Sequence, residues 1–185
     1  MHNLWTAERD HAVALLAVED EDVASRSPAR VLITAPTQQG VEMLARRLHE
    51  TGPRAQFPFV HTCAADLPVE PEVLRESCAS VLAAAAGGSV LISAVEEMEP
   101  VVQDALSELL AGLEFARRPS ADVRLISGTT VSLLDRVAAG TFSERLFYRL
   151  NVIHLMAADI PLQSRLYDGS MSVHPSAAST SMRAR

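Results

Sequence analysis

The sequence predicts an α/β domain in which a parallel five-stranded sheet carries helices on both faces. Five short apolar runs, several of them rich in β-branched residues, recur along the chain, and helical stretches separate them. Strands that alternate with helices of this length are typical of a parallel sheet. The 185 residues suffice for one such domain with its own core.

The expected strands are short. They cover residues 31–34, 59–61, 90–92, 123–126 and 152–155. The first of them, Val31-Leu32-Ile33-Thr34, has the continuous apolar composition of a strand that is buried on both faces.

Helices are expected over 4–18, 41–50, 71–86, 100–116 and 132–150, the last of them broken. Gly52-Pro53 is a stop signal after the second helix, and Gly87-Gly88 ends the third. The acidic run 19–22 is expected to be a solvated connection. Thr129-Thr130 is expected to cap a helix.

Composition divides the chain into three regions. They are an N-terminal helix with an acidic linker over 1–27, the α/β core over 28–166 and a tail over 167–185. The tail is rich in Gly, Ser and Ala and is predicted to be disordered, because it cannot bury enough apolar surface to offset its ordering entropy.

Charge and apolar patterning exclude several functions. A net charge of −7 argues against direct nucleic-acid binding. The absence of a long apolar run or a secretion signal predicts a cytoplasmic protein without a membrane segment. Cys63 and Cys78 lack metal-type spacing and are expected to be reduced thiols, and the six histidines are scattered, so no metal site is predicted.

The chain contains no lysine, and all sixteen of its basic Lys or Arg positions are arginine. A phosphate-binding loop between a strand and a helix normally ends in Gly-Lys, whose ammonium reaches the β- and γ-phosphates. Here the stretch after the first expected strand is Ala35-Pro36-Thr37-Gln38-Gln39-Gly40-Val41, with valine in the place of lysine. These residues predict the scaffold of such a site without its hydrolytic chemistry.

Six phrases stand in a fixed order over residues 31–165. They are Val31-Leu32-Ile33-Thr34 with Gly40-x-Glu42, Pro58-Phe59-Val60-x-x-Cys63-Ala64-Ala65, Gly87-Gly88-Ser89-Val90-Leu91-Ile92, Asp122-Val123-Arg124-Leu125-Ile126, Phe142-x-Glu144-x-Leu146-Phe147-Tyr148-Arg149 and Pro161-Leu162-Gln163-Ser164-Arg165. This ordered set resembles the central AAA+ domain of the sigma-54-dependent transcriptional activators. The resemblance implies a P-loop NTPase-like (AAA+) fold.

The departures from that family's pattern imply a degenerate nucleotide site with no catalytic residue. The matching positions are Gly40, Val41 and Glu42 (Walker A), Ser93 and Ala94 (the two acids of Walker B), Thr130 (the sensor I asparagine) and Arg149 (an arginine finger). Ser143 stands at the position of the other arginine finger. Ala94 cannot act as a general base, and each lost charge-assisted hydrogen bond weakens nucleotide binding.

Glu96, Glu97 and Ser93 are also predicted to have no catalytic role. Glu96 and Glu97 are expected to be surface carboxylates rather than metal ligands. Ser93 lacks the flanking glycines of a nucleophile elbow.

The resemblance also implies missing parts. No sigma-contacting GAFTGA loop can be found between Cys63 and Gly87. Beyond Arg165 we expect neither the family's C-terminal helical lid nor a DNA-binding helix-turn-helix.

The favoured hypothesis is a non-hydrolysing AAA+ core, a pseudo-ATPase, that acts as a protein-interaction or transcription-regulatory module. Its expected partner is a sigma-54 activator ATPase or a second copy, bound through residues 142–150. One alternative is a regulator that holds ATP or ADP weakly at Gly40 and the N–H groups of the helix start. The others are an active activator and a decayed fragment without a selected role.

Overall fold

The computed structural model describes residues 20–115 and 122–157. The helix expected over 4–18, the phrase at 161–165 and the tail predicted over 167–185 lie outside the described residues. Five strands form one sheet: β1 (Val31–Thr34), β2 (Phe59–Cys63), β3 (Ser89–Ser93), β4 (Arg124–Thr129) and β5 (Ile153–Met156). All pairings are parallel and the order is β2-β3-β4-β1-β5, which confirms the predicted sheet.

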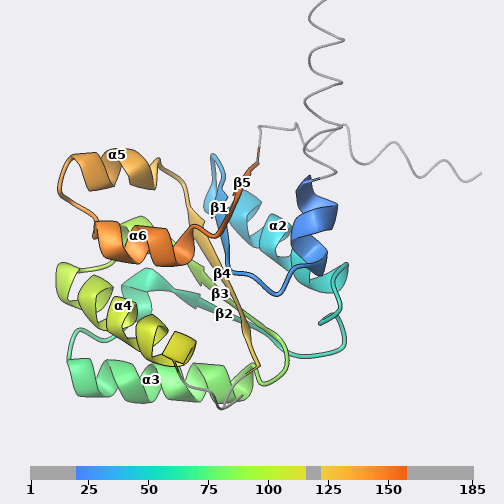
Figure 1. Cartoon of the computed structure of the whole chain (residues 1–185), viewed down its shortest axis with the longest axis horizontal. Coiled ribbons are helices and arrows are strands. Elements are labelled where there is room, and N and C mark those ends of the chain that lie inside the picture. The colour runs from blue at the N-terminus through green and yellow to red at the C-terminus, as the bar shows by residue number, and fades with distance from the viewer. Residues whose placement is uncertain (1–19, 116–121, 158–185) are drawn as a thin grey trace, which may run out of the picture.

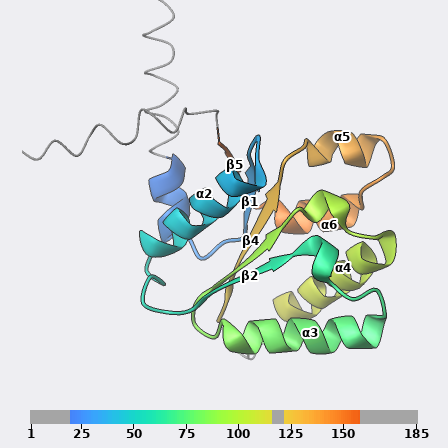
Figure 2. The same cartoon turned by 180° about the vertical axis from the view of Figure 1, so that it is seen from behind.

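Helices cover both faces of this sheet, as predicted. They are α2 (Gln38–Glu50), α3 (Pro71–Ala84), α4 (Pro100–Phe115), α5 (Leu133–Ala138) and α6 (Glu144–Leu150), with a further helix over 20–26 and 3₁₀ turns η1 (Ala64–Asp66) and η2 (Val95–Glu97). Figures 1 and 2 show α2 and the 20–26 helix on one side, and α3 to α6 on the other. No described helix is long and apolar enough to cross a membrane.

Alternation along the strands divides the core into two buried clusters. Val31 and Ile33 of β1 pack in the α2-side cluster, whereas Leu32 between them packs with residues of α4 and α6. All five residues of β3 are buried. Burial on both faces explains why these strands appear in the sequence as continuous apolar runs rather than as alternating ones.

The acidic run is not the connection that the sequence predicted, at least over its described part. Residues 20–22 belong to the 20–26 helix, where Asp22 pairs with Arg26 at 3.0 Å, a spacing of four that places both side chains on one helix face. Glu21 pairs with Arg47 of α2 at 3.2 Å, and Ala24 is fully buried in the α2-side cluster. Glu21 and Ala24 therefore join this helix to the core, whereas the Asp22–Arg26 pair lies within the helix.

The expected final helix is broken, and its predicted cap was wrong. α5 and α6 are separated by a turn in which Gly140 has φ +70, a conformation that glycine adopts without steric cost. Ser132, not Thr129-Thr130, caps α5, since its hydroxyl accepts the Asp135 N–H at 3.2 Å. Thr129 is the last residue of β4, and Thr130 contacts Glu96 instead of capping a helix.

Candidate functional site

The carboxyl ends of β1, β3 and β4 lie at one edge of the sheet, the edge where parallel α/β sheets usually bind ligands. Most of the predicted site residues follow these strands directly: Gly40, Val41 and Glu42 in the start of α2 after β1, Ser93 and Ala94 at the end of β3, and Thr130 after β4. Arg149 lies apart from them in α6, an element that packs on the sheet face opposite α2.

The connection between β1 and α2 is short. Only residues 35–37 separate the two elements, and α2 begins at Gln38, three residues before the predicted start. Thr37 is extended (φ −139, ψ 151), and its hydroxyl accepts the Gly40 N–H at 3.1 Å, which caps the helix. A Gly-rich phosphate loop uses a longer run of free backbone N–H groups to surround a triphosphate, and a connection of this length leaves few of them outside the helix.

Val41 faces the sheet. Its side chain is fully buried and lies against Gly128 of β4, so closely that a Cβ added at Gly128 would stand 2.0 Å from Val41 Cγ1. The position that carries the phosphate-binding lysine in the resemblance is here a core position. The glycine in β4 is what allows this approach.

Ser93 is held by a histidine that the sequence reasoning did not select. The Ser93 Oγ lies 2.8 Å from His61 Nε2 of β2, and His61 Nδ1 lies 4.0 Å from Glu42 Oε1 of α2. Glu42 Oε1 also lies 3.3 Å from Arg46.

The order serine, histidine, glutamate resembles that of a hydrolytic triad, but its geometry differs. A separation of 4.0 Å is longer than a hydrogen bond, so Glu42 does not orient the ring as a triad carboxylate does. Ser93 is only 6% exposed and cannot readily reach a substrate. The Ser93–His61 contact joins the middle of β2 to the end of β3.

Ala94 takes a left-handed conformation, with φ 54 and ψ 41, and is the one non-glycine residue of the described chain with positive φ. Such a conformation is unusual for a residue with a Cβ and costs on the order of 1 kcal/mol. It turns the chain sharply from β3 into η2. The position that matches the Walker B glutamate in the resemblance is therefore a strained turn here and presents only a methyl group.

The turn after Ala94 brings Glu96 to the sensor I position. Glu96 Oε1 accepts the Thr130 N–H at 2.9 Å and the Thr130 hydroxyl at 2.8 Å. The expectation of a surface carboxylate was wrong for Glu96, because it is partly buried and its Oε2 is enclosed without a hydrogen-bond partner in the described part of the protein. Glu97 is exposed, as expected.

The segment predicted as an interface uses most of its apolar side chains in its own core. Phe142, Leu146, Phe147 and Leu150 are all buried, and only Tyr148, at 64% exposure, presents a large apolar surface. Ser143, at the first arginine-finger position, caps α6 by accepting the Leu146 N–H. Arg149 is partly buried, and its carbonyl accepts a hydrogen bond from Arg30 at 3.1 Å.

The described residues contain no group of three or more His, Cys, Asp or Glu arranged to hold a metal ion. Cys63 and Cys78 are free and partly buried. Burial raises the pKa of the Cys78 thiol.

Comparison with known proteins agrees with the resemblance. Residues 73–156 match the family model described as the sigma-54 interaction domain. The regulatory protein AtoC of Escherichia coli is 35% identical over 163 residues, which cover 78% of this chain and 35% of AtoC. The chain belongs, through this domain, to the sigma-54 interaction family. It spans about a third of the length of such relatives.

Solved structures confirm the AAA+ fold of the sigma-54 interaction domain. NtrX of Brucella abortus in complex with ATP superposes with a TM-score of 0.63 at 26% identity, over 83% of this chain and 42% of that one. The P-loop NTPase domain of the sigma-54 transport activator from E. coli gives a TM-score of 0.57 at 21% identity, which shows the fold alone, over 76% of this chain and 99% of that one.

Proposed function

We propose that this sigma-54 interaction domain is a non-hydrolysing AAA+ core that acts as a protein-interaction or transcription-regulatory module. The observation that carries the proposal is the buried Val41 at the start of a helix that follows β1 after three residues. A triphosphate at this edge needs a cation on its β- and γ-oxygens. Position 41 offers only an isopropyl group to the sheet, and no lysine exists elsewhere in the chain to replace the missing one.

The Walker B positions support the same proposal. Ser93 has no charge to offer Mg²⁺, and its hydroxyl is engaged by His61. Ala94 has no proton acceptor. Glu96 is the nearest carboxylate along the chain, and one of its oxygens already accepts two hydrogen bonds from Thr130.

The experiment is a turnover and binding measurement on the purified chain, with the P-loop NTPase domain of the sigma-54 transport activator from E. coli as the positive control. We expect phosphate release at the rate of a protein-free blank, and no shift in melting temperature with MgATP up to millimolar concentration. Turnover above the blank would refute the proposal. Binding without turnover would instead support the alternative of a weak nucleotide-binding regulator.

The module's proposed partner is an AAA+ domain of the same family or a second copy. The exposed apolar side chains Tyr148, Val152 and Met156 follow one another from α6 into β5, a strand at the edge of the described sheet. Exposed aromatic and apolar side chains of this kind are common in protein interfaces. The other large apolar side chains of α6, and Leu155 of β5, are buried in the core, so these three are the ones that remain exposed there.

Association is tested by mixing the chain with an active family ATPase domain and measuring both complex formation and turnover. Tyr148→Ser is expected to weaken the complex, whereas Val73→Ser, a matched change at a 50% exposed valine on α3, should not. Equal behaviour of the two variants would refute the α6–β5 surface. Absence of any complex, with this domain or in affinity purification from the host, would refute the interaction role and favour a fragment without a selected role.

A further inference from the structure

A small cavity lies away from the carboxyl edge, between the 20–26 helix, the end of α2 and the start of β4. Its volume is about 70 Å³. Arg26, Arg54, Arg124 and His49 contribute to its wall, together with Ser25 and Ser27, and none of its lining residues is acidic. The concentration of basic side chains around so small a space requires a physical explanation.

Arg124 is the most unusual member of this cluster. It is 3% exposed, and its guanidinium donates to the carbonyl of Ser25 at 3.2 Å and to that of Ala24. Its Nε–H is buried and has no partner in the described part of the protein. A buried donor of a charged group left without an acceptor costs stability.

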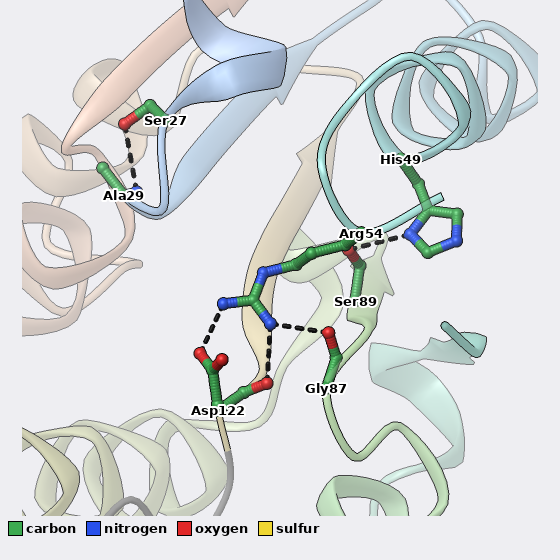
Figure 3. Close-up of polar contacts among 7 residues, drawn as sticks. All are labelled: Ser27, Ala29, His49, Arg54, Gly87, Ser89 and Asp122. Atoms are coloured by element: carbon green, nitrogen blue, oxygen red, sulfur yellow. Dashed lines mark hydrogen bonds and ion pairs between the residues drawn. The ribbon is translucent and has the colours of Figure 1, made fainter. Parts of the chain in front are cut away.

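Arg54 fastens the loops at this end of the sheet, as Figure 3 shows. Its Nη1 donates to the carbonyls of Gly87 and Asp122, each at 2.7 Å, and its Nη2 to the Asp122 carboxylate. The pKa of Arg124 is lowered, first because burial removes water from its charge and second because Arg54 repels it. Arg54 and Arg124 also line the same cavity, so two like charges face one small space.

His49 adds no free donor to the cavity. Its Nε2 donates to the Phe57 carbonyl at 3.1 Å, so its Nδ1 accepts the Ser89 hydroxyl at 3.0 Å, a contact also drawn in Figure 3. Burial lowers the pKa of His49. The cationic character of the cavity thus comes from the three arginines.

We propose that this cavity binds a free tetrahedral oxyanion of the size of inorganic phosphate. About 70 Å³ exceeds the space that one water needs and is far too small for a nucleotide. A water could accept the Arg124 Nε–H, but it would leave the repulsion between Arg124 and Arg54 uncompensated. A multiply charged oxyanion removes both costs at once.

The acidic neighbours do not neutralise the site from within. Asp22 pairs with Arg26 at 3.0 Å and Asp122 pairs with Arg54, but their side chains are 56% and 73% exposed and neither lines the cavity. Solvent and salt screen exposed carboxylates of this kind. Arg124 lines the cavity, is buried, and donates to backbone carbonyls rather than to a carboxylate, so no acidic side chain in the described part of the protein neutralises it directly.

The test is a titration of the full chain with inorganic phosphate, followed by thermal denaturation and by calorimetry, against sodium chloride at matched ionic strength. Phosphate is expected to raise the melting temperature in a saturable manner that chloride does not reproduce. In Arg26→Gln and in Arg54→Gln the affinity should fall about tenfold or more, the effect of losing one charge-assisted hydrogen bond. Arg75→Gln, which removes the same charge from an exposed position on α3, should bind as the wild type does.

Two results would overturn the proposal that the cavity binds phosphate. Identical phosphate and chloride curves for the wild-type chain would overturn the proposal. A phosphate effect that survives unchanged in both Arg26→Gln and Arg54→Gln would place the ion elsewhere and overturn it as well. Arg26 is 75% exposed, so Arg26→Gln is expected to fold, and circular dichroism before titration verifies that all variants do.

Discussion

Replacing Val41 with lysine should destabilise the domain without restoring nucleotide binding. The wild-type side chain is fully buried, and burying a valine contributes about 1.5–3 kcal/mol. Lysine would lose this contribution and would bring an ammonium against Gly128, where no counter-charge lies among the described contacts of Val41. An uncompensated buried charge costs about 3–5 kcal/mol. We therefore expect a combined loss of about 4.5–8 kcal/mol, a large share of a typical stability of about 5–15 kcal/mol.

Urea unfolding followed by circular dichroism measures this loss, and two controls divide it. Val41→Met has a similar length without charge and should cost about 1–3 kcal/mol by overpacking. Val41→Ala removes two methyl groups and should cost about 2 kcal/mol. The difference between the Lys and Met variants isolates the charge. A Val41→Lys protein as stable as the wild type, or one that binds MgATP in the micromolar range, would refute the reasoning that position 41 belongs to the core.

Three further predictions concern other contacts. Gly128→Ala should cost about 1–3 kcal/mol because its methyl group would collide with Val41, and combining it with Val41→Ala should recover part of that loss in a double-mutant cycle of urea unfolding. Glu96→Ala should cost about 1–3 kcal/mol, since it removes the acceptor of two hydrogen bonds, whereas Glu96→Gln keeps an acceptor and should cost less in the same assay. Because the pKa of His49 is lowered in the folded state, the unfolded chain takes up the proton first as the pH falls. The contribution of neutral His49 to the free energy of unfolding should therefore be fully present above pH 6.5 and should decrease as the pH falls below it. His49→Gln should flatten this dependence of the melting temperature on pH, and an unchanged slope would contradict the assignment.

The sheet was predictable because its strands are buried on both faces. Runs such as Val31-Leu32-Ile33-Thr34 have no polar face, and their boundaries in β1 match the sequence prediction. β3 and β4 extend beyond the predicted runs into Ser93 and Thr129, since a neighbouring strand pairs with these polar residues. Hydrogen bonding to a neighbouring strand determines where these two strands end, and such pairing cannot be recognised from the pattern of apolar residues in the sequence.

The start of α2 and the acidic helix were harder to predict for a local reason. Thr37 precedes Gln38-Gln39-Gly40, a stretch with a glycine and no apolar residue, so the apolar period begins only at Val41. The cap at Thr37 extends the helix across this stretch. Asp20-Glu21-Asp22 looked like a solvated linker because its partners, Arg26 and Arg47, are not adjacent in sequence.

Within the candidate site, the resemblance selected Val41, Ser93, Ala94 and Thr130, and the structure places these positions at the carboxyl edge of the sheet. It could not find His61 as the partner of Ser93, because that contact depends on the adjacency of β2 and β3 and on a shared sheet face. The contact between Glu96 and Thr130 was also missed by the sequence prediction, for a similar reason. Its role depends on the left-handed turn at Ala94, a backbone conformation that an alanine does not predict.

The position of β1 in the sheet has a consequence for how this chain reaches its native state. Val31 pairs with Ile126 on one side and with Ile153 on the other, so both neighbours of the first strand are supplied by the last third of the described chain. Contacts between such distant segments carry a large loop-closure entropy and make folding slow. During synthesis both edges of the apolar first strand stay unpaired until nearly the whole sheet has been made, and unpaired apolar strands of this kind favour aggregation of the nascent chain.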